Sequence, residues 1–206
     1  MPTQARVVHD GAVCHIIQRG NNRQRIFREE EDYEKLLYSV LKYKTKYSFD
    51  VYNYCLMSNH LHILIKISHG KDLSKLMQGI FQSFRFYYKK KHEYTGYLFQ
   101  GRYKSKVIET DTYLLECARY IERNPLRAGV VEDLSRYKWS SYLHYAYGLK
   151  NDIITSNPAY SALGNTPIEQ QKAYREYVLT GRVYEYIIDK EFKIKETAGC
   201  HQIGRL

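Results

Sequence analysis

The stretch FDVYNYCLMSNHLHILIKI, residues 49–67, decides the fold, because it contains two β-rich runs, Phe49 to Met57 and His60 to Ile67. The runs are separated by Ser58 and Asn59. Two β-rich runs joined by a two-residue spacer predict a β-hairpin, with residues 60–67 as its second strand.

Two histidines, His60 and His62, stand at the start of that second strand. Strand side chains alternate between two faces, so both imidazoles point one way while Leu61, Ile63 and Ile65 point the other. Neutral imidazole binds divalent transition metals, and a strand can hold two rings at a coordinating distance. The pattern is compatible either with a metal-binding pair or with two core or half-exposed histidines.

Hydrophobic periodicity predicts the elements around the hairpin. A strand is expected over Ala12 to Gln18, a helix from about Glu31 to Lys46, a long helix through Leu73 to Tyr88, and a strand over Tyr97 to Glu109. This order is that of the split βαβ, ferredoxin-like fold, an α+β architecture with an antiparallel sheet and helices on one face. The helices should cover the apolar face of the hairpin, so something else should pack or bind on the histidine face.

A further helix is expected after the fourth strand. Thr110 or Asp111 can cap it, and the residue before Pro125 disfavours helical geometry, so the helix should end near Arg123.

Glu116, Tyr120 and Asn124 lie four residues apart along one stripe of this helix. A carboxylate, a phenol and an amide one turn apart form a plausible reacting surface. The alternative is packing, because the chain has 22 tyrosines and most tyrosines in proteins pack. Glu116 either tunes the phenol or faces solvent.

The chain is basic and rich in tyrosine, with 32 Lys and Arg against 22 Asp and Glu and a net charge of +10. Cations attract a phosphate backbone and aromatic rings stack on unpaired bases, which favours nucleic-acid binding, single-stranded included. A basic surface kept for solubility is the alternative.

Cysteine spacing and hydropathy exclude other classes. Cys14, Cys55, Cys117 and Cys200 form no Cys-x-x-Cys pair, which disfavours a zinc ribbon or a disulfide framework. A signal-peptide core and an apolar run of membrane-spanning length are both missing, so a cytoplasmic location is expected.

Several motifs in order resemble a known family. They are GAVCHI (11–16) with QRGNNR (18–23), MSNHLH (57–62), FQGRYKS (99–105), RYIERNPLRAG (119–129) and WSSY (139–142). The chain resembles the single-tyrosine HUH transposases of the IS200-like superfamily, most closely their REP-associated tyrosine transposase branch, over about residues 11 to 145.

This resemblance implies that His60 and His62 are metal ligands and that Tyr120 is the nucleophile, with Asn124 placed to offer a third ligand to Mg²⁺ or Mn²⁺. Members of the family cut and rejoin single-stranded DNA next to imperfect hairpins through a 5′-phosphotyrosine link. His15 is expected to be structural rather than a ligand. Candidate hairpin-binding residues, chosen by charge and position, are Arg19, Arg23, Arg25, Arg102, Lys104 and Lys106, for each of which a solvated surface role is the alternative.

The resemblance also suggests a division of the chain. Residues 1–150 would form the catalytic domain, with a loop-rich region after Gly129 in which residues 139–142 pack back onto it. Residues 151–206 would form a helical extension, with a helix from the capping box at Thr166 to about Leu179, followed by a tail.

Two other functions are alternatives. One is a transposase-derived protein that binds structured nucleic acid without cutting it, which the intact His60, His62 and Tyr120 argue against. The other is a two-histidine phosphoesterase, which needs a second His-x-Thr or His-x-Ser motif that the sequence lacks. Relatives act as monomers or as homodimers that exchange the tyrosine helix, and the sequence leaves this open.

Overall fold

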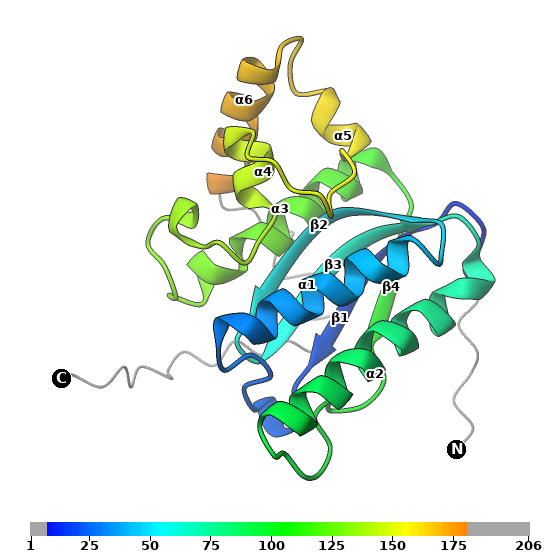
Figure 1. Cartoon of the computed structure of the whole chain (residues 1–206). Helices are drawn as coiled ribbons and strands as arrows, with labels where there is room; N and C mark the ends of the chain where they lie inside the picture. Colours follow the sequence, from blue (N-terminus) through cyan, green and yellow to red (C-terminus); the bar gives the residue numbers. More distant parts are fainter. Residues whose placement is uncertain (1–7, 181–206) are drawn as a thin grey trace, which may run out of the picture.

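The computed structural model describes residues 8–180. Its centre is a four-stranded antiparallel sheet with the order β2-β3-β1-β4 (Figure 1). The strands are β1 (Val13–Arg19), β2 (Phe49–Met57), β3 (His60–Ile67) and β4 (Lys104–Ile108). The α-helices are α1 (Glu30–Lys44), α2 (Leu73–Lys91), α3 (Asp111–Arg127), α4 (Tyr142–Tyr147), α5 (Pro158–Ser161) and α6 (Pro167–Leu179), and single 3-10 turns are η1 (Asn21–Arg23), η2 (Gly70–Asp72) and η3 (Leu134–Arg136).

The predicted hairpin is confirmed at both of its strands, and so is the α+β, ferredoxin-like order of elements. The fourth strand is shorter than the expected Tyr97 to Glu109, and that prediction was wrong at its start. The backbone of the segment before β4 bonds instead to the end of β1 and to the residues that follow it: Asn21 N donates to Leu98 O at 2.9 Å, and Gln100 N donates to Arg19 O at 3.0 Å.

Helices α1 and α2 lie side by side across one face of the sheet (Figure 1). Alternate residues of β3, among them Leu61, Ile63 and Ile65, are buried against this helical layer. Their partners on the helices include Leu36 of α1 and Ile80 of α2. The core therefore lies on the face that the alternation of β3 predicts.

Helix α3 covers the opposite face of the sheet, on which the two histidines lie. Thr110, one of the two caps that the sequence offered, accepts a hydrogen bond from the amide of Tyr113 at 3.3 Å. Cys117 and Ile121 pack against apolar side chains of the sheet, including Leu64. The layer expected over the histidine face is thus a helix of the same chain.

The expected end of α3 near Arg123 was wrong, because the helix continues through Pro125 to Arg127. Proline has no N–H, so the carbonyl of Ile121, four residues earlier, loses its helical partner. The Asn124 side chain supplies one: its Nδ2 donates to Ile121 O at 3.1 Å and to Tyr120 O at 2.9 Å. A side-chain donor next to the proline therefore lets the helix pass it.

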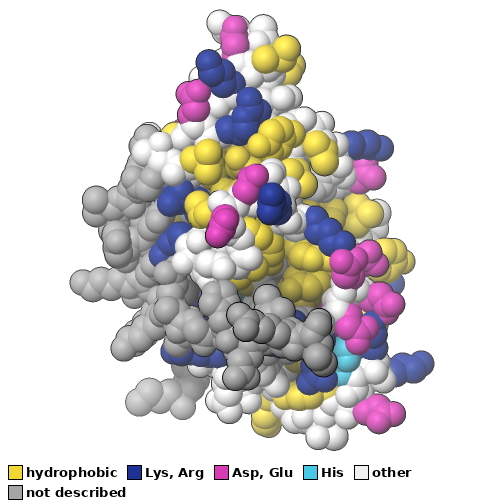
Figure 2. Space-filling view, turned by 90° about the vertical axis from the view of Figure 1, so that its left-hand side faces the viewer, with side chains coloured by type: hydrophobic (Ala, Val, Ile, Leu, Met, Phe, Trp, Pro, Cys, Tyr) yellow, Lys and Arg dark blue, Asp and Glu magenta, His cyan; other side chains and the backbone are white. Residues whose placement is uncertain are grey.

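Helices α4, α5 and α6 form a lobe at the outer side of α3 (Figure 1). The expected α6 capping box is confirmed, with Thr166 Oγ1 accepting from Glu169 N at 3.2 Å. In the upper part of the face shown in Figure 2, acidic and basic side chains alternate over this lobe, with hydrophobic side chains between them. The positive charge of the protein is therefore not gathered on this side of the lobe.

The lobe also holds α3 by hydrogen bonds. Arg123 Nη1 donates to the carbonyls of Val178 and Leu179 at 2.9 and 2.7 Å, and Arg119 Nη1 donates to Thr180 O at 2.5 Å. These three carbonyls end α6. The C-terminal end of α6 is thus capped by side chains of α3.

The segment WSSY packs back as expected: Leu56 N donates to Trp139 O at 2.9 Å and Ser141 N donates to Tyr54 O at 3.0 Å, beside the edge of β2. The region expected to be loop-rich contains α4 and α5. The expected tail over residues 181–206, with Cys200, lies outside the described residues. Within residues 8–180, no helix combines the length and the apolar character needed to cross a membrane.

Candidate active site

His60 and His62 extend from β3 toward α3, with ring centroids 5.1 Å apart and ring planes nearly perpendicular at 84°. His60 Nδ1 lies 2.6 Å from the Asn59 side-chain oxygen, which can only accept a hydrogen bond. The proton of His60 is therefore on Nδ1, and its Nε2 carries a lone pair. Burial and then Arg19 lower the pKa of His60 to about 4, while Asn124 opposes this shift, so the ring is neutral near pH 7.

His15, on β1, contacts His62 directly, with His15 Nε2 2.9 Å from His62 Nδ1. Burial lowers the pKa of His15 to about 3 and holds the pKa of His62 well below its ordinary value. Both rings are therefore neutral, and one of the two nitrogens donates to the other. If His62 is the donor, its Nε2 carries a lone pair, as the Nε2 of His60 does. The sequence placed His15 in a structural role but did not reveal this contact.

The Nε2 atoms of His60 and His62 are both buried, and neither makes a regular hydrogen bond with the described residues. Such buried atoms carry a desolvation cost unless a ligand or a water molecule pairs with them. A divalent transition metal fits that requirement, because neutral imidazole nitrogens with the second nitrogen hydrogen-bonded are ordinary ligands of such metals. Within residues 8–180, no three His, Cys, Asp or Glu side chains form a metal site by themselves. A third protein ligand would have to be of another type.

Asn124 is the amide that the sequence suggested as that ligand. It is 6% exposed, and its Nδ2 is committed to the carbonyls of Tyr120 and Ile121. This orients the amide and leaves Oδ1 as the acceptor toward His60, whose pKa is raised by a hydrogen bond with Asn124. Asn124 thus stands beside the histidine pair.

Tyr120 lies on the same turn of α3 and is fully buried. Its ring centroid is 5.5 Å from that of His62 and 6.0 Å from that of His15. The guanidinium of Arg127 lies 5.2 Å from the Tyr120 ring centroid. The phenol and the histidine pair therefore meet within one chain.

Glu116, the third member of the predicted stripe, faces another set of partners. Its carboxylate accepts from Arg119 at 2.8 Å and from the Tyr177 hydroxyl at 2.7 Å. Both partners belong to the junction of α3 with α6. Glu116 therefore joins the lobe to the helix rather than the reacting centre.

Three of the predicted basic residues share the histidine face. Arg19 pairs with His60 across the sheet, and β4 places Lys104 beside Ile17 and Lys106 beside His15. Lys106 Nζ donates to the Tyr113 hydroxyl at 3.2 Å. The remaining three, Arg23, Arg25 and Arg102, are exposed in the loops at the end of the sheet near His60.

A buried carboxylate on α3, Glu122, was not singled out from the sequence. It accepts hydrogen bonds from Asn53 at 2.9 Å, Ser141 at 2.5 Å and Tyr174 at 2.8 Å, which come from β2, the WSSY segment and α6. Burial raises the pKa of Glu122 to about 7, against the effect of these three donors. A single side chain thus fixes the helix that carries Tyr120 to three other parts of the fold.

Comparison with known proteins gives a family for the chain. The family model described as "Transposase IS200 like" matches residues 9–124. No curated protein sequence matches the chain significantly.

Among solved structures, a REP-associated tyrosine transposase bound to a REP hairpin aligns with a TM-score of 0.61 and 19% identity, covering 76% of this chain and 92% of its own. A candidate transposase from Deinococcus radiodurans aligns at 0.40 and 13% identity, covering 60% of this chain and 97% of its own. The first of these shares the fold described above. Because the family model matches more than half of the residues, the chain belongs to the IS200-like transposase family.

Proposed function

We propose that this transposase cuts and rejoins single-stranded DNA next to a hairpin, in the manner of the REP-associated branch, with Tyr120 as the nucleophile. The observation that carries the proposal is the placement of the Tyr120 ring 5.5 Å from His62, whose Nε2 is buried without a hydrogen-bond partner. The hairpin as partner is supported by the structurally similar transposase bound to a REP hairpin.

His60, His62 and Asn124 would hold Mg²⁺ or Mn²⁺. When bound there, the metal supplies Lewis acidity toward a non-bridging phosphate oxygen. Support comes from the tautomer of His60 that Asn59 fixes, from the contact of His15 with His62, and from the Asn124 side chain beside His60.

The Tyr120 hydroxyl attacks phosphorus, and the proton that it releases balances the proton that the leaving 3′ oxygen takes up. A P–O bond forms to the tyrosine as the bond from phosphorus to the 3′ oxygen breaks, and the leaving strand takes up a proton to end in a 3′ hydroxyl. The 5′-phosphotyrosine link preserves the phosphodiester bond energy, so attack by a 3′ hydroxyl reseals the strand without another energy source. The positive charges of Arg127 and Arg19 lie close to the phenol.

The test is a covalent-adduct assay with 5′ and 3′ labelled, hairpin-flanked oligonucleotides from the protein's own genome, with Mn²⁺ or with EDTA. We expect an adduct on the 5′ phosphate that depends on metal and is lost in Tyr120→Phe. The matched control is Tyr113→Phe, which changes another tyrosine of α3 and should keep the adduct. Binding of hairpins with no adduct under any metal condition would overturn cleavage and favour a binding protein.

A further inference from the structure

Two loops meet at the end of the sheet that carries His60. Gly20, after β1, donates its N–H to Asn59 O at 2.8 Å, next to His60 in the chain. The following residue, Asn21, donates to Leu98 O at 2.9 Å. Backbone hydrogen bonds thus connect the histidine end of β3 with the segment before β4.

Tyr97 stands on this segment with its ring in solvent. It is 80% exposed, the largest fraction among the exposed large apolar side chains described. Its backbone is nevertheless fixed, because Tyr97 O accepts from Gln24 Nε2 at 3.1 Å and from the Tyr94 hydroxyl at 3.3 Å. The ring is therefore an apolar surface presented from an ordered position.

Arg23 and Arg25 lie on the loop that Gln24 attaches to Tyr97, and both are exposed. Within the described part of the chain, neither forms an ion pair. Arg19 lies close enough to Arg23 that the two charges oppose each other, since burial first and Arg23 second lower the pKa of Arg19. Like charges gathered without a counterion attract anions.

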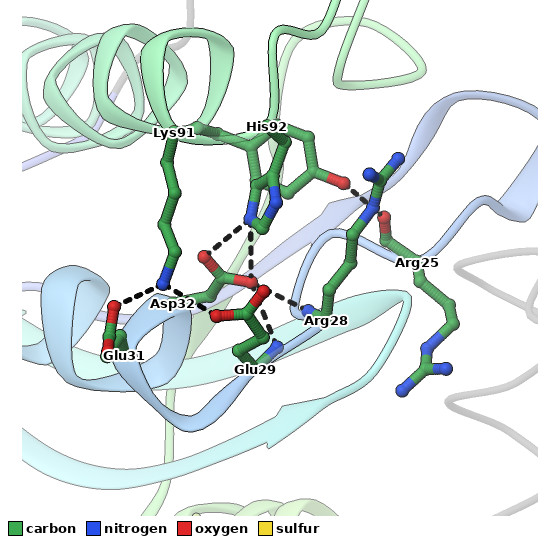
Figure 3. Close-up of polar contacts among 8 residues, drawn as sticks. Arg25, Arg28, Glu29, Glu31, Asp32, Lys91 and His92 are labelled. Atoms are coloured by element: carbon green, nitrogen blue, oxygen red, sulfur yellow. Dashed lines mark hydrogen bonds and ion pairs between the residues drawn. The ribbon is translucent and has the colours of Figure 1, made fainter.

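The acidic residues that follow this loop are already paired. Lys91 of α2 contacts Glu29 and Glu31, and His92 contacts Asp32 at 2.9 Å (Figure 3). In the same view the Arg25 side chain extends away from this cluster. The nearby carboxylates therefore do little to cancel the positive charge of the loop.

The backbone of this loop is strained at two residues. Asn22 and Arg23 have φ values of 47° and 58°, in the left-handed region that favours glycine. Asparagine tolerates this region, whereas arginine pays a cost there. A glycine would occupy position 23 with less strain. The arginine at this position is therefore explained by its side chain and not by the backbone conformation.

We propose that Tyr97, Arg23 and Arg25 form a subsite for unpaired DNA beside the cleavage position, with the Tyr97 ring stacked on a base and the two guanidiniums on flanking phosphates. This inference rests on the proposed function and names a partner for its active site. A lone exposed ring suits an unpaired base, because neighbouring pairs cover the base faces of a duplex. The two exposed arginines stand next to Gln24, which bonds to Tyr97, and supply charge for the phosphates beside that base.

The test measures binding apart from cleavage, by fluorescence anisotropy in EDTA. The probes are a labelled thymidine homopolymer, which suits stacking because stacking tolerates any base, and a blunt duplex of the same length. We expect Tyr97→Ala to weaken single-strand binding about tenfold and to leave duplex binding unchanged. Tyr97→Trp should retain single-strand binding. The control is Tyr38→Ala, which removes a tyrosine 58% exposed on α1 and should change neither.

The variant Arg23→Gly distinguishes the effect of the arginine charge from the effect of the strained backbone. We expect its melting temperature to be equal to or above that of the parent protein, because glycine relieves the left-handed strain. Single-strand affinity should fall severalfold, and the slope of log affinity against log salt should decrease in magnitude by about 0.7. Arg23→Lys should recover most of the affinity.

Equal single-strand affinity of Tyr97→Ala and the parent protein overturns the subsite. An equal loss of affinity for single strand and duplex in Tyr97→Ala also overturns it. So does a parent protein that binds neither probe, a result that would favour a protein partner for this surface. If Tyr97 governs single-strand binding but no Tyr120 adduct forms, the subsite stands and the proposed cleavage fails. If the adduct forms and Tyr97→Ala binds normally, the proposed cleavage stands and the subsite fails.

Discussion

The side chain of Asn124 is hydrogen-bonded to the backbone carbonyl of Tyr120, with 2.9 Å between Nδ2 and O. The residue proposed as third ligand and the residue proposed as nucleophile are thereby fixed to each other on one turn of α3. Their relative position does not depend on a loop, so it is retained as long as the helix is intact.

Asn124→Ala should impair both stability and metal binding. The Ile121 carbonyl would lose its side-chain donor next to Pro125, which costs about 1–3 kcal/mol in unfolding free energy. Asn124→Asp should be similarly destabilised, because a carboxylate cannot donate, but should still bind Mn²⁺. Urea denaturation and calorimetric Mn²⁺ titration measure the two effects. An Asn124→Ala protein of unchanged stability would contradict the role of the amide in carrying α3 past Pro125.

His15→Phe should weaken metal binding without changing a proposed ligand. It removes the ring nitrogen 2.9 Å from His62 Nδ1, and loss of such a supporting partner typically lowers metal affinity about 10–100-fold. Calorimetry with Mn²⁺ measures the change. His69→Ala, at an exposed histidine, is the control and should bind metal normally. Parent-like affinity in His15→Phe would show that His15 only packs.

Glu122 should make the fold less stable as pH rises. Its folded pKa of about 7 lies above its ordinary 4.5, so the folded state binds the proton more tightly than the unfolded state does. The resulting stabilisation is complete below pH 4.5 and is lost as pH rises through 7, by an amount on the order of 3 kcal/mol.

Glu122→Gln should flatten this part of the pH profile of the unfolding free energy, because the amide does not titrate. Its amino group can be accommodated, since the Tyr174 hydroxyl can turn to accept from it. Urea denaturation at several pH values between 4.5 and 8 would reveal the difference. A profile identical to that of the parent protein would mean that Glu122 stays ionised when folded.

Asp32→Asn should destabilise the junction of α1 and α2. Asp32 accepts from Arg28 N at 2.7 Å, from Glu29 N at 3.1 Å and from His92 at 2.9 Å. Burial raises the pKa of Asp32, but these donors outweigh it and the net pKa is lowered, so its contribution is present at neutral pH and lost on acidification. We expect a loss of about 2 kcal/mol in unfolding free energy at neutral pH.

The control for this prediction is Glu31→Gln. Glu31 also contacts the end of α2, through Lys91, but its side chain is 70% exposed, and exposed ion pairs contribute little. Chemical denaturation should show a clearly lower unfolding free energy for Asp32→Asn than for Glu31→Gln. Equal stability of the two variants would refute the importance of the buried pair.

The parts of the fold that the sequence predicted correctly depend on local patterns. The β2–β3 hairpin and the α6 capping box depend on residues within a few positions of each other, and both were confirmed. The stripe of Tyr120 and Asn124 follows from helical spacing alone. That it lies against the histidine face required the whole topology.

Local patterns did not predict the contacts between residues distant in the chain. The end of α3 was wrong because the rule for the residue before proline takes no account of the donor that Asn124 provides. The partners of Glu122 are 19, 52 and 69 residues away, and no spacing rule relates them. His15 could have been matched with His62 only from the β1–β3 register.

The capping of α6 by Arg119 and Arg123 has a kinetic consequence. Exchange of α3 with a second copy would first require these bonds to the carbonyls of residues 178–180 to break in both chains. A chain that keeps its own α3 also keeps its own phenol beside its own imidazoles. The initial rate of strand cleavage should therefore be first order in protein, with a turnover per chain that dilution does not change.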